Sequence, residues 1–248
     1  MEDLDRIPSS PARRLHSLVG KARTDQKILQ HPAKQYIATE FSVDKEDTLE
    51  IYRSYSVVLS LLRQTRLALE RSENAMKQPC LNAIPRIAKA LSNMQLEQGW
   101  IQVNQHITDG DFDLLAIAAQ ILESDGYELL LTEEELNEFE SQAAIIAEEI
   151  AGAELPDDIK AVLGQLFDSL RQSLKDYHVS GVDGLKAALA SAYGQIILEA
   201  ETIAPHKRDT VLIKAWGWFG KINTAVSTIG HEHNAGKFIS EVIDRLPE

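Results

Sequence analysis

The sequence predicts an all-α protein: a multi-helix bundle of about eight or nine mostly antiparallel helices with little or no β-sheet. Helix-forming residues such as Ala, Leu, Glu, Gln and Ile dominate the 248 residues, whereas aromatic side chains, which favour strands, make up only 6%. Apolar residues recur at steps of three and four along most of the chain, which is the period of a helix face. Capping residues, prolines and glycines separate these stretches at short intervals, and short connections favour antiparallel neighbours.

Four helices are expected in the first half of the chain. Ser10 followed by Pro11 is typical of an N-cap and a first helical position. Pro32 and Pro79 interrupt helices, and Asp111 is expected to cap a later one. The expected helices cover residues 11–30, 48–76, 84–94 and 112–124, and residues 34–41 are ambiguous.

Five helices are expected in the second half. Thr132 and Glu135 have the spacing of a capping box, and Ser180 and Asp183 have the spacing of a second one. Pro156 is suited to the start of the helix between them. The expected helices cover residues 133–151, 156–177, 181–204, 210–229 and 236–245.

The net charge of −13 is distributed unevenly along the chain. Residues 1–94 carry a net charge of +4, residues 95–160 carry −16, and residues 161–248 carry −1. The charge changes sign near Gly99 and Trp100, where no helical period is evident. We therefore expect a mildly basic N-terminal helical region, residues 1–95, and a C-terminal helical region, residues 96–248, that contains the acidic block 95–160. One continuous domain is the alternative.

The acidic block favours a non-enzymatic protein-interaction module: an immunity, antitoxin or regulatory component, or an assembly subunit. Many of its acidic residues fall outside the apolar stripes, so they are expected on an exposed face that attracts a basic protein partner and repels nucleic acid. Solubility and pairing with helix dipoles would also account for them. The positive N-terminal part adds self-association as an option. The acidic residues expected at the interface are Glu133, Glu134, Glu135, Glu138, Glu148 and Glu149.

The helix expected at residues 210–229 is apolar on two sides. Trp216 and Trp218 are two positions apart and point about 200° from each other, and Phe219 lies on the stripe of Trp216. A helix of this kind is either central in its domain or lies against a partner. We assign Trp216, Trp218 and Phe219 to an interaction surface, with a central core helix as the alternative. A membrane-perturbing effector that uses residues 211–229 is a further functional alternative.

Arg171 and His178, with six residues between them and interpreted as lying on one helix that continues to residue 178, form an Arg-x6-His pattern. This pattern resembles the signature of HEPN ribonucleases, which are all-helical. The resemblance covers eight residues and implies that the histidine moves a proton while the arginine holds a phosphate. A HEPN-like ribonuclease or toxin is therefore the principal alternative function, and the other reading is a solvated helix face.

No other part of the sequence has the pattern of a catalytic or cofactor site, so we expect no cofactor and no metal ion. The single cysteine, Cys80, excludes an intrachain disulfide. The first residues are acidic and unlike a secretory signal, and no apolar stretch is long enough to span a bilayer. A cytoplasmic protein is expected.

Overall fold

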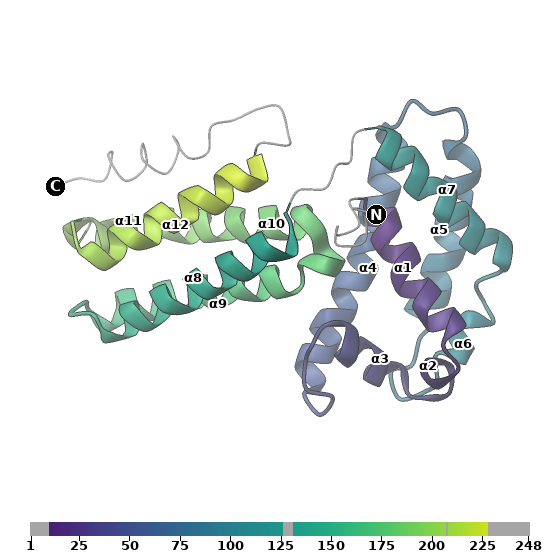
Figure 1. Ribbon diagram of the computed structural model, residues 1–248, viewed down its shortest axis with the longest axis horizontal. Helices are drawn as coiled ribbons and strands as arrows, with labels where there is room; N and C mark the ends of the chain where they lie inside the picture. The colour runs from purple at the N-terminus through teal and green to yellow at the C-terminus, as the bar shows by residue number, and fades with distance from the viewer. Residues whose placement is uncertain (1–9, 126–130, 207, 228–248) are drawn as a thin grey trace. The chain divides into compact units, whose positions relative to one another are not determined.

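The computed structural model describes residues 10–125, 131–206 and 208–227, and these residues form helices without any strand. The all-α prediction is therefore confirmed. An isolated bridge between Pro32 and Gly99 is the β-type pairing found in this part of the chain. The helix expected at residues 236–245 lies outside the described residues. The helices, labelled in Figure 1, are α1 (Pro11–Thr24), α2 (Gln26–Gln30), α3 (Ala33–Glu40), α4 (Thr48–Arg71), α5 (Lys77–Ser92), α6 (Ile101–Asn104), α7 (Asp109–Ser124), α8 (Glu133–Gly152), α9 (Asp157–Lys175), α10 (Tyr177–Leu198), α11 (Ala200–Ile203), the 3-10 helix η1 (Ala204–His206) and α12 (Thr210–Ser227).

Several helix ends differ from the sequence prediction. Asp25 interrupts the helix expected at residues 11–30, because its backbone is extended and its carboxylate accepts a hydrogen bond from the amide two residues on. Pro79 lies in the first turn of α5 rather than before the helix. A proline is tolerated there because the amides of the first turn donate no intrahelical hydrogen bond. Thr108, not Asp111, caps α7: its hydroxyl accepts from the Asp111 amide at 3.1 Å. Asp111 therefore has the acidic place of a capping box.

The described chain divides into two compact units. The N-terminal unit contains the described residues within Pro8–Leu129 together with His178–Gly181. The C-terminal unit contains the described residues within Leu130–Tyr177 and Val182–Glu248. This division differs from the expected one, because the proposed boundary at residues 95 and 96 falls inside the N-terminal unit.

The segment around Trp100 belongs to the core of the N-terminal unit. The Trp100 side chain is fully buried. The backbone before it is bonded to the start of α3: the Ala33 amide donates to the Gln98 carbonyl at 2.8 Å, and the Lys34 amide donates to the Leu96 carbonyl at 2.9 Å. A weak helical period here reflects a packed, irregular segment and not a linker.

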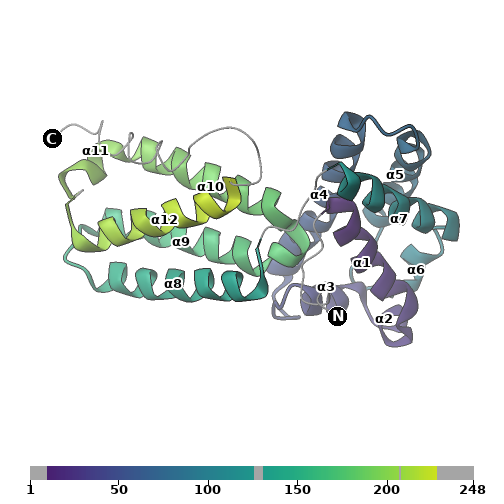
Figure 2. The same ribbon diagram turned by 45° about the horizontal axis from the view of Figure 1, so that its top comes forward.

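Four long helices build the N-terminal unit. α1 packs against α4 and α7, and α5 packs against α4 and α7 (Figures 1 and 2). Their buried residues form one continuous apolar cluster, to which the shorter helices and Val179 contribute. A three- and four-residue apolar step along residues 48–76 would place Tyr52 with Tyr55, Leu62 and Leu69 on one buried face, but Tyr52 is 58% exposed.

Arginines neutralise the first part of the acidic block within the N-terminal unit. Arg13 Nη2 lies 2.8 Å from a Glu123 carboxylate oxygen, and Arg23 pairs with Asp109. The Arg86 guanidinium donates from Nε to the Asp111 carboxylate at 2.7 Å. The described residues of this unit contain 14 basic and 14 acidic residues, a net charge of zero. The acidic residues of the block up to residue 125 and the basic residues of the N-terminal region therefore lie in one unit, where their charges balance.

Asp111→Asn is expected to lower stability more at neutral pH than in acid. Burial by itself raises the pKa of the Asp111 carboxyl, but hydrogen bonds from Arg86 and Thr108 outweigh it and hold the pKa below its ordinary value. Such a carboxyl stabilises the fold above its unfolded pKa of about 3.9 and loses that contribution as the pH falls through the folded value. Urea unfolding followed by circular dichroism should show the difference between wild type and Asp111→Asn shrinking as the pH falls below about 4.

The control for this experiment is Asp113→Asn on the same helix, since the Asp113 side chain is exposed. That substitution is expected to change the free energy of unfolding by less than about 0.5 kcal/mol at each pH. An Asp111→Asn effect that stays constant between neutral and acidic pH would contradict the role assigned to this carboxyl.

The C-terminal unit is built from α8, α9, α10 and α12, which lie side by side in both views (Figures 1 and 2). α8 packs against α9 and against α12. The buried stripe of α9 is the one that its sequence predicts, with Phe167 as an additional buried residue. The buried side chains of all four helices form a second apolar cluster, separate from that of the N-terminal unit.

The chain is not regularly helical at Gly181, within α10. Gly181 has φ 62° and ψ −161°, and Ser180 does not form the expected capping box, since its buried hydroxyl has no hydrogen-bond partner among the described residues. Arg14 from α1 occupies this place instead. Its Nε donates to the Val179 carbonyl at 2.8 Å and its Nη2 donates to the Ser180 carbonyl at 3.3 Å. The prediction of a second capping box was therefore wrong.

Candidate interaction surface

The first turn of α8 is defined by the capping box that its sequence predicts. Thr132 Oγ1 accepts a hydrogen bond from the Glu135 amide at 3.2 Å, and the Glu135 carboxylate accepts from the Thr132 amide at 2.8 Å. Glu133 and Glu134 stand beside it at the positive end of the helix dipole. Part of the acidic charge of α8 is therefore used to start the helix.

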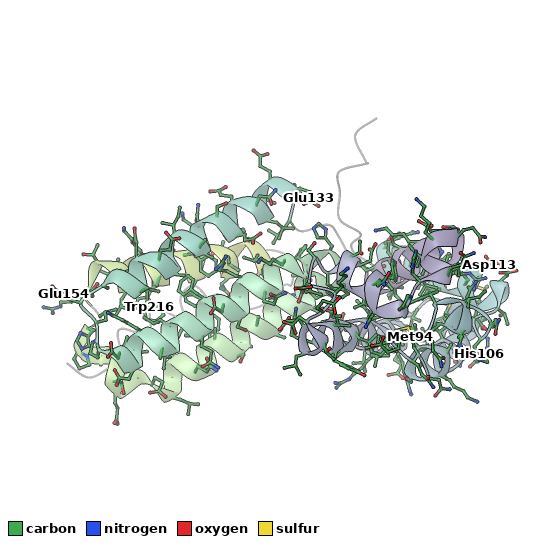
Figure 3. The ribbon with its side chains drawn as sticks, turned by 90° about the horizontal axis from the view of Figure 1, so that it is seen from below. Met94, His106, Asp113, Glu133, Glu154 and Trp216 are labelled. Carbon is green, nitrogen blue, oxygen red and sulfur yellow. The ribbon has the colours of Figure 1, made fainter. Side chains whose placement is uncertain are left out.

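α8 is nevertheless a strongly acidic helix, with seven glutamates and no lysine or arginine. Figure 3 shows Glu133 near its start and Glu154 beyond its end, both directed away from the surrounding helices. The described residues of the C-terminal unit include 16 acidic and 7 basic residues, a net charge of −9. The excess negative charge of the described chain thus lies in this unit. The glutamates of α8 with exposed side chains are Glu133, Glu134, Glu135, Glu138 and Glu148.

One ridge of α8 combines acidic and apolar residues. Glu138, Gln142, Ile145 and Glu149 follow one another at steps of four, three and four residues, so they lie along one side of the helix. Ile145, the apolar residue of this ridge, is 57% exposed, and its neighbours along the ridge are polar or charged. Single exposed apolar residues are common on protein surfaces, so Ile145 gains interest only from the apolar groove beside it.

A groove of about 400 Å³ lies between this ridge and α12. The buried side chains of Ile146 and Trp218 line it from below, and the exposed Ile145 lines it from α8. On α12 the exposed Gly217 faces open space, with no atom within 4 Å of the position that a Cβ would take. The remaining lining residues are Gln142, Glu149, Lys214 and Lys221.

Each end of the groove has one lysine and one glutamate. At one end Lys214 Nζ donates to both carboxylate oxygens of Glu149, each at 2.8 Å. At the other end Gln142 Nε2 donates to the Glu138 carboxylate at 2.8 Å, and Lys221 lines the α12 side. The pair Lys214–Glu149 joins α12 to α8 through two residues that are 65 positions apart in sequence, and both side chains remain partly exposed. Such a pair contributes little to stability by itself but marks the rim of the groove.

The tryptophan-rich stretch of α12 belongs to the core. Trp216, Trp218 and Phe219 are 8%, 3% and 0% exposed, which favours the central-helix alternative, although Trp218 also lines the groove. The Phe167 ring lies 5.0 Å from the Trp218 ring, and Trp218 Nε1 donates to the Phe139 carbonyl at 3.3 Å. Trp216 lies among the ribbons of this unit (Figure 3).

The same burial removes support for a membrane-perturbing use of residues 211–229, because the apolar stripes of α12 are already covered by the unit. Val211, Leu212 and Ile222 are buried together with the aromatic residues. The nearby Tyr193 ring lies 6.4 Å from Phe219, and burial raises the pKa of Tyr193 to about 12. None of the described helices combines the length and apolar character that crossing a bilayer requires.

Arg171 and His178 do not lie on one helix. α9 ends at Lys175 and α10 begins at Tyr177, so the helix break falls between the two side chains. Arg171 belongs to the C-terminal unit and His178 to the N-terminal unit. The expectation that one helix carries both residues is therefore wrong, whereas the ribonuclease alternative itself, in which the arginine and histidine meet in a cleft, stays a prediction.

The described chain offers few other places for chemistry. Cys80 is buried, and burial raises the pKa of its thiol, which disfavours a nucleophilic thiolate. A hollow of about 50 Å³, lined in part by Met94, Gln98 and His106, has little more than the volume of a single water molecule. Within the described residues no three His, Cys, Asp or Glu side chains are grouped so that they could hold a metal ion.

Sequence reasoning missed the groove while identifying the acidic residues beside it. Ile145 could have been noticed as an apolar residue outside the buried stripe of α8, since Ala143, Ile146 and Ile150 already form that stripe. Gly217 gives no such signal, because a helical glycine is equally compatible with close packing and with an open groove.

Comparison with known proteins adds no further assignment: no family model matches the chain, and neither a curated protein nor a solved structure matches it.

Proposed function

We propose that this protein is a non-enzymatic interaction module whose C-terminal unit binds a basic protein partner through the outer face of α8. The observation that carries the proposal is the exposed Ile145, which lies beside an apolar groove on a helix with five exposed glutamates. Solubility alone explains glutamates on a helix surface, but it does not explain an apolar groove beside them. An apolar centre with a charged rim is the usual anatomy of a protein interface.

The distribution of charge supports a basic partner. The N-terminal unit is neutral over its described residues, and arginines bind its α7 carboxylates. In the C-terminal unit only part of the acidic charge is compensated, as by Lys214 on Glu149. A surface potential of one sign accelerates association with an oppositely charged protein and disfavours nucleic acid.

This charge requirement fits an inhibitor that covers the phosphate-binding surface of another protein, as immunity proteins and antitoxins do. It fits equally an assembly subunit or regulator that docks on a basic neighbour. These classes share one expectation, a complex whose rate of formation falls as ionic strength rises.

The double variant Glu138→Lys, Glu148→Lys is expected to lose the partner. Neither side chain takes part in the capping box of α8, so the change acts on the surface and not on the helix start. Capture at low ionic strength from an extract of the source cells, followed by mass spectrometry, identifies the candidate partner. Association kinetics with that purified partner should then be slower by about tenfold or more for the variant, because reversed charges repel the basic surface.

The matched control is Glu46→Lys, Glu73→Lys, which makes the same change in net charge at exposed positions of the N-terminal unit. The control should associate like the wild type. The proposal fails if the captured protein is not basic, if both double variants behave alike, or if the difference persists at about 1 M salt, where charges are screened over about 3 Å.

A further inference from the structure

We draw no further inference here: the strongest candidate, the apolar groove between α8 and α12, adjoins the surface already described, has one lysine and one glutamate at each end, so that charge selects no occupant, and nothing in the structure shows what covers it.

Discussion

Phe167→Ala is expected to lower the stability of the C-terminal unit by about 3–5 kcal/mol. Phe167 is fully buried at the centre of this unit, with the Trp218 ring at 5.0 Å and the Phe219 ring at 5.4 Å. The substitution removes a ring that two others contact, and the surrounding helices are held by their own packing and cannot close the space completely. The loss therefore includes the transfer free energy of the ring and the cost of a cavity.

The three tryptophans allow each unit to be followed separately. Trp100 lies in the N-terminal unit, whereas Trp216 and Trp218 lie in the C-terminal unit. In a Trp100→Phe background, urea unfolding followed by tryptophan fluorescence reports on the C-terminal unit, where Phe167→Ala should shift the transition to lower urea. The control Leu198→Ala, at a position 82% exposed, should change stability by less than about 0.5 kcal/mol. A loss below about 1 kcal/mol for Phe167→Ala would contradict the central position of this ring.

Gly181→Ala is expected to destabilise the N-terminal unit by about 3 kcal/mol or more. The backbone of Gly181, with φ 62° and ψ −161°, lies in a region that is essentially restricted to glycine. A Cβ at this position would overlap the Arg14 guanidinium. Arg14 is 4% exposed and its guanidinium donates to the Val179 and Ser180 carbonyls, so it cannot move aside without breaking these bonds.

Hydrogen exchange and urea unfolding would measure this effect. Amides near residues 178–181 should lose protection in Gly181→Ala, and the Trp100 signal should shift to lower urea in a Trp216→Phe, Trp218→Phe background. Combining Gly181→Ala with Arg14→Ala should cost less than the sum of the single changes, because both disrupt the same contact. Gly110→Ala, in α7 of the same unit, should instead raise stability by about 0.5–1 kcal/mol, since the added Cβ lies 3.9 Å from Thr108 Oγ1. A Gly181→Ala protein as stable as the wild type would contradict the conclusion that the backbone conformation and the Arg14 side chain require glycine at this position.

The acidic half of the candidate surface follows from sequence, but the apolar half does not. The glutamates of α8 are recognisable because they fall outside the stripe of Ala143, Ile146 and Ile150, which a helical period reveals. The groove depends on α12 lying beside α8, and the Trp218–Phe139 hydrogen bond that joins them spans 79 residues. No local sequence pattern predicts a contact between residues so far apart in the chain. Gly217 and Ile145 can therefore be recognised as parts of one groove only in the folded unit.

The sequence by itself determined the helical class and most helix ends, including the capping box of Thr132 and Glu135. These features depend on residues within about four positions of one another, which a linear reading contains. Tertiary structure decided which charges remain unbalanced and which aromatic side chains are buried. Arg13 meets Glu123 across 110 residues within the N-terminal unit, whereas the acidic residues of α8 belong to the C-terminal unit, which carries the excess negative charge. Electrostatic and apolar contacts act through space, so the binding surface is defined by the packing of the helices and not by their order in the chain.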